Sequence, residues 1–241
     1  MNGDNDTRRP HKGRKKRPTL DPHSSRQEPN PSLLKVFLVF IRYSSPALLI
    51  LLTLAAVVAR LALGHFTAWD LLIPAVIVAL QPFVEWLIHV FILHFKPRTF
   101  LGLKLDLHAA RLHRAHHRAP WQLSLIFIPK LTGVIGLIIA AVGWYLVLPT
   151  PQLWATAMLS TLGMALTYEW IHYLTHTNYL PKSEFYRRRW RYHRLHHFKN
   201  EHYWMGVTGH LGDKVLGTFP ADPKKVETSK TSRTLGVESP A

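Results

Sequence analysis

The sequence predicts an all-α membrane protein with four transmembrane helices and a cytoplasmic helical cap that holds a histidine-rich site. Three observations lead to this fold class: four apolar stretches of membrane-spanning length, a large excess of histidine, and basic residues placed almost entirely on one side of the predicted spans. The chain has 241 residues, of which 16 are His and none is Cys. Without Cys, disulfides, iron–sulfur clusters, thiolate zinc sites and Cys nucleophiles are excluded.

The first segment, residues 1–31, is predicted to be a disordered basic tail, because it is rich in Arg, Lys, Pro, Asp and Ser and has few large apolar residues. Its KGRKKRP run (residues 12–18) resembles a nuclear-localisation patch, but the apolar stretches downstream favour a positive-inside tail. A cleaved signal peptide is not expected, because the apolar region begins too late. Residues 33–42 predict a short helix at the membrane interface.

Four apolar stretches follow, each with the roughly 20 residues that a helix needs to cross about 30 Å of hydrocarbon. The predicted spans are Ser44–Gly64, Leu71–Ile92, Leu131–Leu148 and Leu153–Tyr173. The second and fourth are less apolar, with their polar residues near the C-terminal ends. Together they predict one membrane domain at residues 32–219, followed by a second disordered tail at residues 220–241.

The charge distribution predicts the orientation. The net charge is +16, with 30 Lys and Arg against 14 acidic residues, which is typical of proteins that bind nucleic acid or a membrane surface. The apolar stretches favour the membrane, and no nucleic-acid partner is expected. Every Lys and Arg except Arg60 lies before the first span, between the second and third, at the start of the third, or after the fourth. The positive-inside rule therefore predicts both termini and the central connection in the cytoplasm.

Ten histidines form four clusters in the order HX4H, HX2HH, HX3H and HX2HH. Residues at i, i+3 and i+4 of a helix fall within one stripe, so each HX2HH cluster is expected to present its rings on one side. His89 and His94 are five residues apart, about 140° around an ideal helix, which predicts a helix end or a distortion near Pro97. The ten predicted metal ligands are His89, His94, His113, His116, His117, His172, His176, His193, His196 and His197.

The clusters are expected to meet at one face of the membrane. The second and fourth spans run in the same direction and carry their His pairs at their inner ends, and both HX2HH clusters lie in segments on that side. The halves are also similar: EWLIHVFILH (residues 85–94) resembles EWIHYLTH (169–176). Two similar halves that give five imidazoles each predict a site for two metal ions, and neutral imidazole suits iron, zinc and copper. His108, His202 and His210 are left open as ligands.

Two carboxylates precede the clusters within the spans. Ten neutral imidazoles leave the charge of two metal ions uncompensated. Glu85 lies one turn before His89, and Glu169 lies three residues before His172. We predict that these carboxylates offset the charge and orient ring N–H groups of the ligands. An ion pair with a loop Arg is the alternative, although a carboxylate within a span is costly and therefore favours a functional role.

The order of the four clusters resembles the fatty acid hydroxylase superfamily, which also contains sterol desaturases. The resemblance runs from about residue 71 to 219 and includes the ending MGVTGHLGDKVLGT (residues 205–218), where Gly212 stands at a position that is usually Trp and His210 is unusual. It implies a membrane diiron oxygenase with two iron ions held by the ten histidines and O2 as co-substrate. Zinc fits the same ligands and is expected in some isolated material.

The predicted function is O2-dependent hydroxylation of a lipid, on a fatty acyl or related aliphatic chain. A separate electron-donor protein is expected, because nothing in the chain resembles a flavin or haem domain. The run RRRWRYHR (residues 187–194) would bind either an acidic donor or an acidic lipid head group. The alternatives are desaturation or hydroxylation of a sterol or carotenoid at the same site, and a non-enzymatic metal-binding or metal-transporting membrane protein. A transporter is less favoured, since its polar residues would lie near the bilayer midplane.

Overall fold

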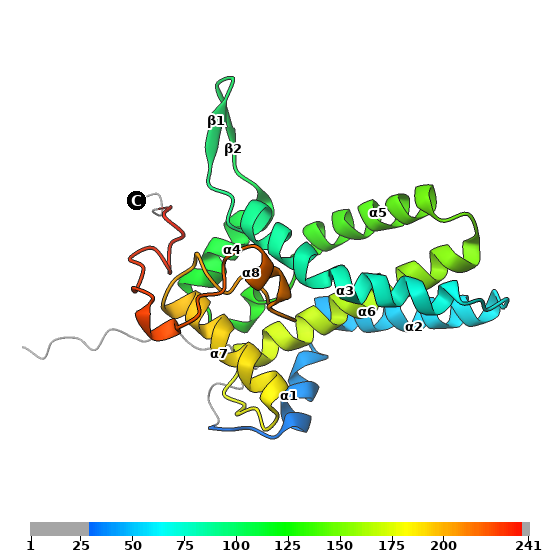
Figure 1. Cartoon of the computed structure of the whole chain (residues 1–241), viewed down its shortest axis with the longest axis horizontal. Coiled ribbons are helices and arrows are strands. Elements are labelled where there is room, and N and C mark those ends of the chain that lie inside the picture. Colours follow the sequence, from blue (N-terminus) through cyan, green and yellow to red (C-terminus); the bar gives the residue numbers. More distant parts are fainter. Residues whose placement is uncertain (1–28, 238–241) are drawn as a thin grey trace, which may run out of the picture.

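The computed structural model describes residues 29–237 and is mostly helical (Figure 1). Most of the predicted N-terminal tail, residues 1–28, and the last residues, 238–241, lie outside the described residues. The elements in chain order are α1 (Leu33–Phe40), α2 (Ser44–Ala62), α3 (Trp69–Ile88), the π-helical turn η2 (His89–Leu93), β1 (Arg98–Phe100), β2 (Leu103–Leu105), α4 (His108–Arg118), η3 (Leu123–Leu125), α5 (Lys130–Val147), α6 (Pro151–Thr175), α7 (Glu184–Phe198), α8 (Leu211–Val215) and η4 (Pro223–Lys225).

Within residues 29–237, three helical segments are long and apolar enough to cross a membrane: Ser44–Ala62, Trp69–Leu93 and Leu123–Val147. They correspond to the first three predicted spans. Many of their large apolar side chains are exposed, among them Leu51 and Ile139, as expected of surfaces that face lipid. The chain is therefore an integral membrane protein.

The fourth predicted span corresponds to α6, and its crossing of the membrane stays a prediction. This 25-residue helix begins at Pro151, where the Thr150 side chain accepts a hydrogen bond from the backbone N–H of Leu153. It contacts α2, α3 and α5, and runs alongside α2 and α3 (Figure 1). Because α6 faces other helices, small and polar residues such as Ala157 and Thr156 are buried on it, which explains its lower hydrophobicity.

A buried ion pair joins the ends of three helices. Arg60, near the end of α2, lies 2.6 Å from Asp70 at the start of α3, and its Nε donates to Thr156 of α6 at 2.7 Å. The arginine side chain is only 4% exposed. Arg60 is the one basic residue that departs from the predicted charge asymmetry, and its charge is neutralised within the protein.

The opposite ends of the helices carry the cap-like elements. α4, α7 and α8 gather at one end of the long helices (Figure 1). There α1 packs against the end of α6 in an apolar cluster. Its buried members are Val36, Phe40, Leu123, Ile126, Tyr173 and Leu174. This cluster fixes the last turns of α6, which carry two of the predicted metal ligands.

The all-α prediction was wrong in one element, since β1 and β2 form an antiparallel hairpin that extends away from the helices (Figure 1). Leu101 and Gly102 form its two-residue turn with φ angles of 49° and 76°. Positive φ at both turn residues matches the right-handed twist of a tight hairpin. The strands have three residues each, and Leu-Gly lacks the usual Asn-Gly signature, so the pattern gave no signal.

The second predicted disordered tail also differs from the structure over its described part. Residues 226–237, which we call the strap, fold back onto the ends of α4 and α7. Ser229 N–H donates to the Lys199 carbonyl at 2.7 Å, and Ser232 and Leu235 are buried. The polar composition of this segment predicted disorder, but in the structure its polar groups form hydrogen bonds at the ends of α4 and α7.

Candidate metal centre

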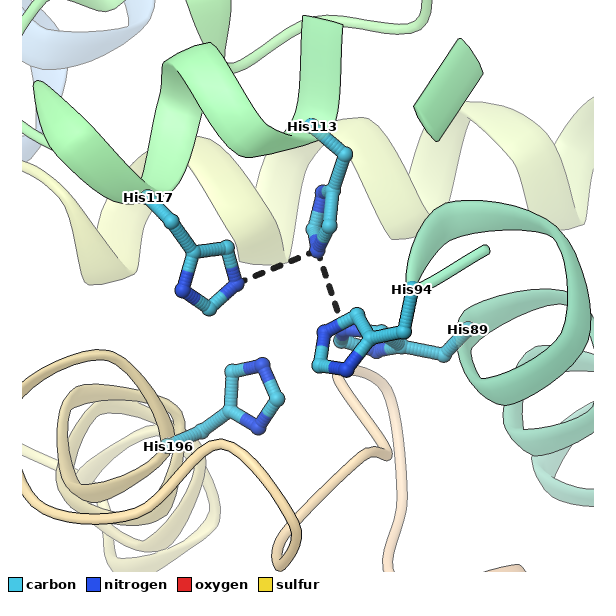
Figure 2. A group of neighbouring side chains, drawn as sticks. All are labelled: His89, His94, His113, His117 and His196. Carbon is cyan, nitrogen blue, oxygen red and sulfur yellow. Dashed lines mark hydrogen bonds between the residues drawn. The ribbon is translucent and has the colours of Figure 1, made fainter. Parts of the chain in front are cut away.

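The ten predicted ligands come together where η2, α4, α6 and α7 meet. All are buried except His94, which is partly buried. They form two sets, and within each set one nitrogen per ring lies within 4.8 Å of the others. The first metal group (Figure 2) is His89, His94, His113, His117 and His196, and the second metal group is His116, His172, His176, His193 and His197.

The two halves of the sequence exchange one ligand. His116 comes from the first half but lies in the second metal group, and His196 comes from the second half but lies in the first. The ring centroids of His196 and His89 are 4.6 Å apart, as are those of His116 and His197. The duplicated sequence therefore builds two interlocked groups, each completed by the other half.

The HX2HH spacing explains how one helix serves both groups. Successive residues are 100° apart in a helix, so His116 and His117 point to opposite flanks of the stripe that His113 shares. His113 and His117, one turn apart on α4, face the first metal group, while His116 faces the second. The predicted common stripe is present, but it is divided between two groups.

A π-helical turn places the HX4H pair. The N–H of His94 donates to the carbonyl of His89 at 2.9 Å, an i to i+5 hydrogen bond. The extra residue in this turn brings the two rings to the same side, with centroids 4.7 Å apart. The distortion expected from the five-residue spacing is confirmed, and it lies before Pro97 within the last turn of the second span.

Backbone carbonyls fix the orientation of several rings. The Nδ1 atoms of His89, His117 and His196 lie 2.6, 2.8 and 2.8 Å from the carbonyl oxygens of Met205, Ser232 and Tyr203. A carbonyl only accepts, so each Nδ1 carries the proton and Nε2 keeps its lone pair. That is the tautomer in which Nε2 binds a metal ion.

Burial keeps the ligands outside the spans neutral. It lowers the pKa of His117 and of His196 to about 3, and lowers the pKa of His113, His176 and His193 well below the ordinary value. The imidazoles are thus uncharged at neutral pH. Metal ions bind this form, so no proton has to be displaced.

The nitrogen atoms at the centre of each group fit a cation. His113 Nε2 lies 3.2 Å from Nε2 of both His89 and His117. The latter two nitrogens hold lone pairs, and a single N–H on His113 can satisfy only one of them. In the second group, His193 Nε2 is similarly 2.9 and 3.1 Å from Nε2 of His176 and His197. A metal ion at each centre would satisfy these converging lone pairs.

Comparison with known proteins decides the family. A sequence model of the fatty acid hydroxylase family matches residues 74–218, well over half of the chain and all ten histidines. The chain belongs to the fatty acid hydroxylase family. The resemblance expected from the order of the His clusters is confirmed, and with it a metal-dependent lipid hydroxylase family.

Curated relatives in this hydroxylase family are similar at modest identity. The chain is 27% identical to a dihydroceramide fatty acyl 2-hydroxylase of Arabidopsis thaliana over 141 residues, which cover 57% of this chain and 56% of the relative. It is 29% identical to the fatty acid 2-hydroxylase of Rattus norvegicus over 144 residues, 58% of this chain and 38% of the relative. It thus spans about half or less of the length of these relatives.

The chain is also similar in sequence to a yeast hydroxylase and in fold to a solved hydroxylase domain. The ceramide very long chain fatty acid hydroxylase of Saccharomyces cerevisiae is 30% identical over 141 residues, 56% of this chain and 35% of the relative. A solved structure of full-length Scs7p, in which only the hydroxylase domain is visible, superimposes with a TM-score of 0.60 and 25% identity. The match covers 77% of this chain and 68% of that one. The fold is therefore that of a fatty acid hydroxylase domain.

The two carboxylates act on backbone rather than on the rings. Glu85 Oε2 accepts from the N–H groups of Val207 and Thr208 at 3.1 and 3.0 Å. This loop carries the Met205 carbonyl that receives His89 Nδ1. No hydrogen bond joins Glu85 to a histidine ring within the described residues, and its predicted role in offsetting charge and orienting ring N–H groups stays a prediction. Glu85 holds the loop that orients His89.

Glu169 repeats this arrangement in the other half. Its Oε1 accepts from the N–H of Ile128 at 2.8 Å and from the hydroxyl of Ser45 at 2.7 Å. Ile126, in the same segment, packs in the apolar cluster at the end of α6. Each half therefore places a buried glutamate about one turn before a predicted ligand, and each glutamate holds a neighbouring backbone segment.

The family ending at residues 205–218 holds this loop against α3. Asp213 accepts from the N–H groups of Met205 and Gly206 at 2.7 and 2.8 Å. A Cβ at Gly212 would collide with the backbone carbonyl of Pro82 in α3. The glycine that departs from the usual Trp of the family therefore permits a close approach of α8 to the second span.

The histidines left open lie outside both groups. His108, His202 and His210 are absent from the two sets of converging nitrogens found among the described residues. His202 is 66% exposed, and His210 packs its ring against Tyr192 and Phe219. Sequence reasoning missed the carbonyls of Tyr203, Met205 and Ser232, because a backbone acceptor has no residue-type signature.

Proposed function

We propose that the protein is an O2-dependent membrane hydroxylase that inserts one hydroxyl group into a fatty acyl chain, using two iron ions held by the two metal groups. The observation that carries the proposal is the pair of buried, neutral five-histidine groups at the end of apolar, membrane-length helices. Iron bound in these groups would activate O2 for attack on an unactivated C–H bond.

The residues of the chain contribute position, protonation state and exclusion of water. The imidazoles outside the spans are neutral and three of the ten rings are oriented by backbone carbonyls, so the charge of the metal pair would stay available for O2. Burial removes bulk water from the nitrogens that face each centre. The centre adjoins the ends of α3 and α6, so an acyl chain can extend from the bilayer toward it while its polar head group stays at the interface.

The relatives narrow the proposed substrate. Their names specify hydroxylation at carbon 2 of a fatty acid or of the fatty acyl group of dihydroceramide. We extend the proposal to the same class of substrate and the same carbon. The positive-inside asymmetry further supports four spans, with both termini and the metal centre on the cytoplasmic side.

A separate donor protein must supply two electrons. The basic run on α7 contains two kinds of arginine, those that bond to backbone carbonyls and those that are exposed. Arg189 donates to the Thr208 carbonyl at 2.6 Å and Arg194 to the Thr175 carbonyl at 3.0 Å, so both serve the fold. Arg187, Arg188 and Arg191 are exposed. We propose that these three form the contact with an acidic donor protein. Charge reversal at the three positions should lower donor-dependent turnover and leave metal content unchanged.

The test is mass spectrometry of lipids from cells grown under 18O2, with and without the protein. We expect a fatty acyl product that carries one labelled oxygen at carbon 2, and its loss in the His193→Ala/His196→Ala/His197→Ala variant. A new double bond without label would establish desaturation of an acyl chain or sterol instead. Absence of any O2-dependent lipid change, with metal loaded and donor supplied, would favour the metal-binding alternative.

A further inference from the structure

The strap, residues 226–237, lies beyond the part of the chain that matches the hydroxylase family, which ends at residue 218. It nevertheless reaches the metal centre. Ser232 is only 6% exposed and Leu235 only 3%, so this polar segment is seated in the protein rather than lying over its surface. The strap is therefore a buried segment that lies outside the matched family region.

The strap is attached to both helices that carry an HX2HH cluster. At the end of α4, Arg118 donates to the Val237 carbonyl at 2.8 Å, and Arg233 donates back to the Arg118 carbonyl. Beyond the end of α7, Ser229 N–H donates to the Lys199 carbonyl at 2.7 Å. The Thr231 hydroxyl also donates to the buried carboxylate of Glu201. The strap therefore bridges α4 and α7.

Between these attachments, the Ser232 carbonyl accepts the Nδ1 proton of His117 at 2.8 Å. His197 is the counterpart of His117 in the other half, and its Nδ1 has no hydrogen-bond partner among the described residues. The strap thus orients His117 in the first metal group, whereas His197 in the second metal group has no such hydrogen bond among the described residues.

We propose that the strap is a positioning element for the first metal group, which fixes the tautomer and orientation of His117 and thereby retains that metal ion selectively. This inference rests on the proposed metal centre. Removing the strap frees the His117 ring to rotate and to move its proton to Nε2, the ligand atom. Loss of a partner that orients a metal-bound histidine typically weakens metal binding about 10- to 100-fold.

The test compares metal retention in the purified full-length protein and in a variant that lacks residues 226–241. Both are loaded anaerobically with Fe(II) and challenged with a chelator, and metal per chain is measured over time. We expect the full chain to release both ions slowly, and the variant to release one ion at least about 10-fold faster. A variant lacking only residues 238–241 is the control and should match the full chain.

Second substitutions identify the ion that is lost. In the variant without the strap, adding His94→Ala should cost no further metal, because His94 belongs to the same group. Adding His176→Ala should cost the remaining ion. The reverse pattern would overturn the inference, as would equal release of both ions at the rate of the full chain. A full chain that binds no metal would instead refute the proposed centre itself.

A point variant decides the case in which truncation disrupts the fold and both ions are lost. Arg233→Ala removes one attachment and keeps the chain length, and we expect faster release of one ion, with partial rescue by Arg233→Lys. Lys230→Ala changes an exposed neighbour and is the matched control. Metal release from Arg233→Ala at the rate of the control would overturn the proposal.

Discussion

The ring of His116 lies 4.6 Å, centroid to centroid, from the ring of His197, although the two residues come from different halves of the sequence. Its neighbour His117 lies in the other metal group. The duplicated motif is therefore not two copies of one site. Each group depends on both α4 and α7, and this dependence can be tested with pairs of substitutions.

The first prediction concerns the exchanged ligand. His196→Ala combined with His89→Ala should lower occupancy in one metal group only, because both residues belong to the first. His196→Ala combined with His172→Ala should lower occupancy in both groups. Elemental analysis of the purified variants measures this, with the exposed His202→Ala as control. Sites built from separate halves would give the opposite result.

The second prediction concerns Glu85. Glu85→Ala leaves the buried N–H groups of Val207 and Thr208 without their acceptor, at about 1–3 kcal/mol for each. Amide hydrogen exchange at residues 205–208 should rise, and metal affinity should fall about 10- to 100-fold. Glu85→Gln keeps an acceptor oxygen and should restore part of both. Unchanged exchange in Glu85→Ala would contradict the role assigned to this carboxylate.

The third prediction concerns acid stability without metal. Folding lowers the pKa of His117 and of His196 to about 3, so the unfolded chain binds more protons below about pH 6.5. The free energy of unfolding should therefore fall as pH drops below 6.5, by up to about 1.4 kcal/mol per pH unit for each such residue. The fall should continue until the folded pKa is reached.

Thermal unfolding of the chelator-treated protein between about pH 7.5 and pH 5 measures this slope. His117→Asn removes one of the titrating rings and should flatten the slope, whereas His202→Asn changes an exposed ring and should not. Identical slopes in all three proteins would show that buried imidazoles do not control acid stability.

The fourth prediction concerns the ion pair far from the metal centre. Arg60→Leu or Asp70→Asn leaves one charged or polar partner buried at the junction of α2, α3 and α6, and each should cost about 3–5 kcal/mol. The double variant should cost less than the sum of the two, and metal content should stay normal in each protein that folds. Thermal unfolding in detergent is the measurement. Strictly additive losses would indicate that the pair is not coupled.

The sequence predicted those features that depend on a single segment. Long apolar runs identified α2, α3 and α5, because an apolar run of that length is typical of a helix that crosses a membrane. The predicted bounds of α6 were close, but its lower hydrophobicity reflects burial against neighbouring helices, which no local pattern reveals. The short hairpin at residues 98–105 gave no signal because its strands have three residues each and its turn lacks Asn-Gly, and the strap gave none because it depends on contacts with distant residues.

The spacing of the histidines predicted which residues are candidate ligands and that they lie together. It did not predict which histidine belongs to which metal group. Helical geometry places His113, His116 and His117 in one stripe, but only the packing of α4 between the two groups decides which ring faces which centre. The supporting groups were partly missed for a related reason. Glu85 and Glu169 were identified by their cost within a span, whereas the carbonyls of Met205 and Ser232 carry no residue identity.

The exchange of His116 and His196 also has a consequence for biosynthesis. A nascent chain that has completed α3 and α4 contains four of the five ligands of the first metal group, and lacks His196. The second group likewise waits for His193 and His197. Both groups reach their full ligand number only when α7 has left the ribosome. A metal ion at the proposed centre would therefore find its full set of ligands only after α7 has been synthesised.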